Sequence, residues 1–158
     1  MLLPDSSRLS NLKQRYRSLP PMLRTVTLAM IIVGVVVLAT PLAPGATFHL
    51  DGLELHWHDL WQTRVAIALL MLGPLMVLAG FGVLAGHPWA RPVLMGFPLI
   101  QVIPFYIVHW AFGAPAPIRS VSVGTYLLLG GVWAAIAAAY LYGRPAVRRH
   151  FAGAARST

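Results

Sequence analysis

Four long apolar segments constrain the possible folds of this chain more strongly than any other feature of its sequence. They cover residues 26–42, 65–85, 93–112 and 121–142. A helix needs about 20 mostly apolar residues to cross a bilayer, and the bilayer core holds no water to satisfy an open backbone. Hydrophobic residues make up 58% of the 158 positions and charged residues only 10%, unlike a soluble globular protein. The sequence therefore predicts a single domain over residues 1–158, an all-α integral membrane protein built as an antiparallel four-helix transmembrane bundle.

The basic residues are distributed unevenly around these segments. Ten lie before the first segment, between the second and third, or after the fourth: Arg8, Lys13, Arg15, Arg17, Arg24, Arg91, Arg144, Arg148, Arg149 and Arg156. Only Arg64 and Arg119 lie in the other two loops. Because cytoplasmic loops of membrane proteins carry an excess of Lys and Arg, we predict a multi-pass protein of the bacterial inner membrane. Its basic tails at 1–24 and 143–158 would both be cytoplasmic.

The net charge of +8 has the same explanation. Basic residues beside a membrane span are attracted to anionic lipid by about 1 kcal/mol each. Nucleic-acid binding usually shows as a basic face on a soluble fold, and the arginines here follow the ends of apolar segments instead. We therefore predict membrane lipids as partners and no binding to nucleic acid.

The stretch before the first span resembles a helix lying on the membrane surface. Apolar residues recur at helical spacing from Leu9 to Leu19, with basic residues between them. Pro20 and Pro21 follow and should end this helix. This helix could be an anchor that helps to set the topology of the chain. The alternative is a docking element.

Small residues at four-residue spacing predict where two helices approach each other closely. Gly82 and Gly86 have this spacing in the second span, and Gly130, Ala134 and Ala138 have it in the fourth. The second and fourth spans are therefore predicted to form the tightest pair, either within one chain or between two copies.

The third span contains the residues most suited to bind a ligand inside the membrane. Pro98 and Pro104 each leave an upstream carbonyl without its helical partner. Gln101 and His109 are costly inside a bilayer and should face the interior of the bundle. On a straight helix both could line one crevice, so they are the candidate cofactor-binding residues. The alternative is that Gln101 bonds a carbonyl freed by a proline and His109 extends to the interface.

The loop over residues 45–62 is predicted to form a short outer β-hairpin. Asp51-Gly52 is a typical two-residue turn, and apolar and polar residues alternate on both sides of it. Directly paired residues share a face of the hairpin. One face would carry Phe48, Leu50, Leu53, Leu55 and Trp57, and the other His49, Glu54, His56 and, if the strand continues, His58. The apolar face should rest on the bundle or the membrane, because a lone hairpin is marginally stable.

The polar face of this hairpin is the candidate metal site. Imidazole and carboxylate groups suit zinc or copper, and the candidate ligands are His49, Glu54, His56 and His58. A flat hairpin face holds its side chains parallel, however, whereas a tetrahedral site needs them to converge. A pH-responsive surface and an ordinary solvated face are the alternatives. The chain has no cysteine, which excludes disulfides and thiolate sites.

The sequence contains little equipment for catalysis. It has four carboxylates, no cysteine nucleophile and no glycine-rich phosphate loop. We therefore predict a non-enzymatic protein without a cofactor, acting through another membrane protein or by self-association in an accessory, assembly or immunity-type role. The alternative is a ligand-handling protein that binds a metal, haem, quinone or small solute through the histidine hairpin and the third helix.

Overall fold

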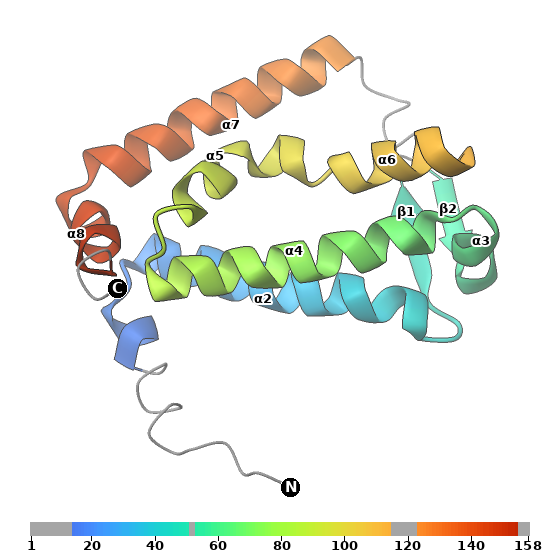
Figure 1. The fold of residues 1–158 in the computed structure, drawn as a ribbon, viewed down its shortest axis with the longest axis horizontal. Coiled ribbons are helices and arrows are strands. Elements are labelled where there is room, and N and C mark those ends of the chain that lie inside the picture. The colour runs from blue at the N-terminus through green and yellow to red at the C-terminus, as the bar shows by residue number, and fades with distance from the viewer. Residues whose placement is uncertain (1–13, 51–52, 115–122, 155–158) are drawn as a thin grey trace, which may run out of the picture.

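The computed structural model describes residues 14–50, 53–114 and 123–154 (Figure 1). Its helices are α2 (Pro21–Ala39), the 3-10 turn η1 (Thr40–Leu42), α3 (Trp57–Gln62), α4 (Val65–Ala85), α5 (Ala90–Ile100), α6 (Ile103–Phe112), α7 (Val123–Gly143) and α8 (Pro145–Ala154). Residues 14–18 are also helical. The strands β1 (Thr47–Leu50) and β2 (Leu53–His56) form an antiparallel hairpin. The predicted helical class with a small hairpin is thus confirmed.

Three helical segments are long and apolar enough to cross a membrane: Pro21–Leu42, Val65–Ala85 and Gly124–Gly143. The predicted span 93–112 is not one helix, because α5 and α6 are bent by 49° at a short break. Pro104 in the first turn of α6 cannot continue the hydrogen bonds of α5, and the chain makes a tight turn in which the Val102 N–H bonds the Leu99 carbonyl at 3.3 Å. Within the described residues there are therefore three candidate spans, or four if this bent pair is one span.

The tightest pair is α2 with α4, not the second and fourth spans as predicted. A Cβ added to Gly34 would lie 2.9 Å from the Gly73 carbonyl oxygen, and one added to Gly80 would lie 2.7 Å from a side-chain carbon of Ile31. These glycines let the two backbones approach closely. Gly82 instead accommodates the ring of Trp89, and Gly130 faces Leu99 of α5. Two of the small residues that the prediction used, Gly82 and Gly130, thus pack against large side chains and not against the backbone of a facing helix.

Helix α4 lies at the centre of the molecule. In the 18-residue apolar stretch of each helix, the buried share is 56% for α4, 22% for α2 and 11% for α7. Two buried clusters form along it, one near the hairpin and one near the opposite end, where the N-terminal region and α8 meet (Figure 1). We call these the hairpin end and the terminal end. Phe97 of α5 packs against both clusters.

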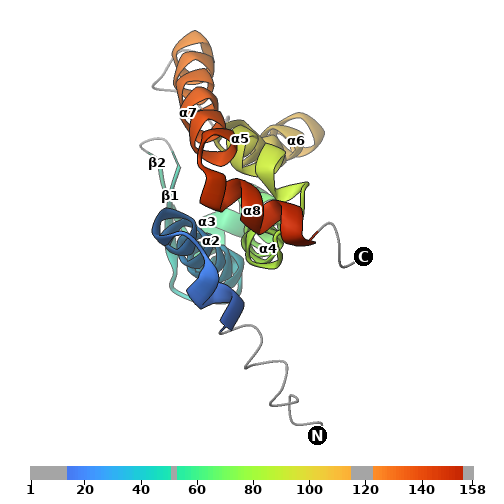
Figure 2. The ribbon, with the colours of Figure 1, turned by 90° about the vertical axis from the view of Figure 1, so that its left-hand side faces the viewer.

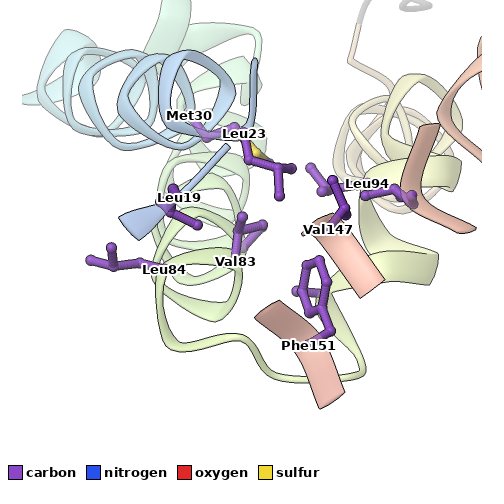
Figure 3. Close-up of a cluster of buried hydrophobic side chains, with 11 residues drawn as sticks. Leu19, Leu23, Met30, Val83, Leu84, Leu94, Val147 and Phe151 are labelled. Carbon is purple, nitrogen blue, oxygen red and sulfur yellow. The ribbon is translucent and has the colours of Figure 1, made fainter. Parts of the chain in front are cut away.

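The terminal end is closed by α8, a helix that the prediction of a simple basic tail at 143–158 missed. Val147 and Phe151, one turn apart, are 1% and 2% exposed and pack with Leu23, Val83 and Leu94 (Figure 3). Figure 2 shows α8 lying between α4 and the pair formed by α5 and α7. Leu19 is buried in the same cluster. Leu9 and Leu12 of the predicted surface helix lie outside the described residues.

We expect Gly73→Ala to weaken the fold, because the new Cβ would lie 2.7 Å from the Leu38 Cβ and 2.9 Å from the Gly34 carbonyl oxygen. Overpacking of this kind typically lowers the free energy of unfolding by about 1–3 kcal/mol. The measurement is thermal or denaturant unfolding of the purified chain in detergent. Gly131→Ala is the control, since no described atom lies within 4 Å of its Cβ position. Equal losses for both variants would contradict the assigned contact.

Candidate functional site

The hairpin has the predicted register. Thr47 pairs with His56, Phe48 with Leu55, His49 with Glu54 and Leu50 with Leu53. The predicted turn, Asp51 and Gly52, lies outside the described residues. The apolar face packs on the helices, since Leu55 is 4% exposed and the Phe48 ring stacks on Phe105 of α6 with 6.3 Å between ring centroids. The hairpin therefore covers the hairpin end of the helices as a lid.

The exposed face of the lid brings together two of the four predicted metal ligands. The His49 Nε2 lies 3.9 Å from the Glu54 Oε1, and both side chains are mostly exposed. His56, at the end of β2, is exposed opposite Thr47. An exposed pair of this kind contributes little to stability.

His58 does not continue this face as predicted, because β2 ends at His56 and α3 begins at Trp57. The backbone N–H of His56 donates to the Asp59 carboxylate at 3.1 Å, a contact that helps to start a helix. His58 therefore lies on α3, where its Nε2 accepts a hydrogen bond from the Gln62 amide at 2.7 Å.

Trp57 also leaves the predicted apolar strand face. The indole N–H groups of Trp57 and Trp61 both donate to the Pro41 carbonyl at 2.9 Å, which ties α3 to the end of α2. Pro41 belongs to η1, whose last carbonyls have no helical partner of their own. The two tryptophans therefore close the end of α2 and fix the lid beside it.

The metal site is left with one assembled pair. Across the described residues, no group of three or more His, Asp or Glu side chains is placed to hold a metal ion. His49 and Glu54 could supply two ligands, whereas His56 lies at the end of the strand and His58 on a different element. A zinc or copper site here stays a prediction.

Gln101 and His109 lie on opposite sides of the break in the third span. Gln101 ends α5, so the straight-helix geometry behind the predicted crevice does not apply. The Nδ1–H of His109 donates to the Ala114 carbonyl at 2.6 Å. Gly113, with φ of 69°, allows the chain to turn back for this contact. His109 thus bonds the segment that follows its own helix.

Sequence reasoning missed the residues that satisfy the carbonyls freed in α5. Pro98 lacks the N–H that would bond the Leu94 carbonyl, and the indole N–H of Trp133 on α7 donates to that oxygen at 3.0 Å. The Pro98 carbonyl, released where the helix breaks, accepts a hydrogen bond from the Tyr126 hydroxyl, also on α7. The sequence signal for these bonds was Pro98 in the third apolar segment together with Tyr126 and Trp133, two aromatic hydrogen-bond donors, in the fourth.

Comparisons with family models, with curated proteins and with solved structures found no match. The interpretation therefore depends on the geometry of this chain alone. Within the described residues, the polar side chains of the candidate site lie on the lid, on α3 and on either side of the break after α5.

We expect Trp133→Phe to cost about 1–3 kcal/mol of unfolding free energy, the usual penalty for a buried carbonyl left without a partner. Pro98→Ala restores a backbone N–H that can bond the Leu94 carbonyl within α5. In the Pro98→Ala background, Trp133→Phe should therefore cost less, and a double-mutant cycle followed by unfolding in detergent measures the difference. Strict additivity would show that Trp133 does not act through that carbonyl.

Proposed function

We propose that this chain is a multi-pass inner-membrane protein that acts by binding another membrane protein through the exposed face of α7. The observation that carries this proposal is a stripe of small residues at four-residue spacing, Gly131, Ala135, Ala139 and Gly143. All four are exposed. No described atom lies within 4 Å of a Cβ built on Gly131 or Gly143. We call these four residues the α7 stripe.

The contact between α2 and α4 explains why such a stripe is significant. In that pair, glycines at the interface allow backbone atoms and side chains of the facing helix to come very close. Helices in a bilayer gain little from burying apolar side chains, because lipid is equally apolar, so close packing at small residues drives their association. The α7 stripe has the same composition and faces no described helix.

The apolar surroundings of the stripe are consistent with a partner inside the membrane. Only 11% of the 18-residue apolar stretch of α7 is buried. Three of its large apolar residues, Leu128, Val132 and Ile136, are 65%, 50% and 57% exposed. Scattered exposed apolar residues would be unremarkable on a membrane helix, which lipid can cover. The specific feature is the flat row of small residues, which lipid does not require.

The distribution of charge supports the proposed orientation. Apart from Arg64, the described basic residues belong to the segments of the terminal end, whereas Arg64, Glu54 and Asp59 belong to β2, α3 and the start of α4 at the hairpin end. With the positive end in the cytoplasm, the lid would face outward. An accessory or assembly role fits a chain that offers a docking helix and a rigid outer lid.

The ligand-handling alternative has less support. The polar groups proposed for it are divided between the lid, α3, the break after α5 and the end of α6. His109 and His58 are already hydrogen-bonded within the chain. Metal, haem or quinone found in stoichiometric amount in the purified protein would revive this alternative.

Site-directed crosslinking tests the proposal. Because the sequence has no cysteine, a label directed at thiols attaches only to the cysteine that is introduced. We expect Ala135→Cys, carrying a photoreactive maleimide, to give an adduct of defined mass in native membranes. The control is Val36→Cys, which is 58% exposed and lies on α2 instead of α7. It should give lipid adducts only. An adduct of twice the chain mass would identify a second copy as the partner.

Gly131→Leu should then reduce the Ala135→Cys protein adduct to about a tenth or less, since loss of roughly 1.4 kcal/mol lowers binding tenfold. The variant should still fold, because Gly131 is exposed and a Cβ built on it meets no other described element within 4 Å. Identical adduct patterns at positions 135 and 36, or no effect of the leucine, would refute docking through the stripe.

A further inference from the structure

A cleft of about 540 Å³ opens at the terminal end where α5 begins and α7 ends against α8. Its lining residues are Arg91, Tyr142, Pro145, Arg148, Arg149 and Ala152. Half of these are arginines, and none is acidic. Figure 2 shows why they meet: α8 turns back from the end of α7 and lies beside the start of α5.

Arg91 is held in a fixed position at the base of this cleft. Its Nη2 donates to the Arg148 carbonyl at 3.3 Å. The guanidinium carbon lies 4.6 Å from the ring centroid of Phe151 and 5.4 Å from that of Tyr142, within range of cation–π attraction. The Nε is buried and has no hydrogen-bond partner among the described residues. The charge is thus oriented by aromatic rings without being neutralised.

Arg148 and Arg149 form the exposed wall of the cleft. Together with Pro145 and Ala152 they lie at positions separated by three, four and seven residues, which places them along one side of α8. The adjoining side carries the buried Val147 and Phe151. With Val147 and Phe151 packed in the terminal cluster, Arg148 and Arg149 line the same cleft as Arg91.

No carboxylate within the described residues neutralises these arginines. The described carboxylates, Glu54 and Asp59, belong to the hairpin end, where they contact His49 and the backbone of His56. The terminal end carries Arg15, Arg17, Arg24, Arg91, Arg144, Arg148 and Arg149. Guanidinium groups gathered in a cleft without a counter-ion among the described residues create a positive potential that attracts anions.

We propose that this cleft binds an anionic phosphate group. Arg148 and Arg149 contact its oxygens with their planar donor forks, which match phosphate geometry, and Arg91 supplies a fixed third charge beneath them. The headgroup of an anionic membrane lipid and free phosphate share this chemistry. The lipid source depends on the membrane location proposed above, whereas binding of free phosphate does not.

The test uses the purified full chain in a non-ionic detergent. Short-chain phosphatidylglycerol, short-chain phosphatidylcholine and inorganic phosphate are each titrated, with thermal unfolding and native mass spectrometry as readouts. The cleft variant is Arg148→Gln with Arg149→Gln. The matched control is Arg17→Gln with Arg144→Gln, which removes the same charge from exposed residues at the same end outside the cleft lining.

We expect phosphatidylglycerol or phosphate to raise the unfolding temperature of the wild type, with phosphatidylcholine weaker. The cleft variant should lose affinity by roughly tenfold or more, while the control pair keeps it. Binding of phosphatidylglycerol alone identifies a lipid headgroup as the source, and binding of phosphate as well identifies a soluble anion. If the cleft variant unfolds without ligand, Arg149→Gln alone replaces it.

Equal losses in the cleft and control variants would overturn the proposal, because they would show general attraction to a basic surface. Absence of binding to either anion would overturn it as well. Neither result bears on the α7 stripe, which crosslinking at position 135 tests separately.

Discussion

The close contact between α2 and α4 is the interaction on which the rest of this structure depends. Gly34, Gly73 and Gly80 remove the side chains that would hold the two backbones apart. The pair then offers one continuous surface, and α4 uses its other sides to pack against the lid, α5, α6 and α8. The Nε2–H of His150 on α8 even bonds the Val83 carbonyl of α4 at 2.8 Å. Any shift of α4 relative to α2 would therefore displace both ends of the molecule.

Helix α7 is attached by a different physical means. It buries little surface, yet Trp133 and Tyr126 place hydrogen-bond donors on carbonyls of α5 that have no helical partner. Such bonds gain strength where water is scarce, because an unpaired carbonyl there is expensive. A few directed contacts thus fix α7 in register with α5 and leave most of its surface uncovered. Because few contacts hold α7, most of its surface is left uncovered. The α7 stripe and the arginine cleft both lie on surface that closer packing around α7 would bury.

Local patterns in the sequence predicted the parts of the structure that local forces determine. The hairpin register follows from an alternation of period two around Asp51-Gly52, and the long helices follow from their apolar composition. His58 and Trp57 could not be placed in this way, because α3 depends on tryptophan contacts with Pro41 across 16 and 20 residues. The α2–α4 pairing was equally hidden, since small residues occur in several spans and only the facing helix decides which are used. Helix α8 was detectable: Val147 and Phe151 lie four apart between basic residues, the same pattern that was recognised before the first span.

The break between α5 and α6 has a mechanical consequence. Helix α5 is bonded to α7, whereas α6 packs on α4 and carries Phe105, on which Phe48 of the lid rests. Bending at a helix break is far easier than bending along a continuous helix. Phe48 of the lid and Phe105 of α6 therefore lie on one side of the break, and the Trp133 bond that holds α7 to α5 lies on the other. The break at Gln101 and Val102 thus separates the part of the molecule that carries the lid from the part that holds α7.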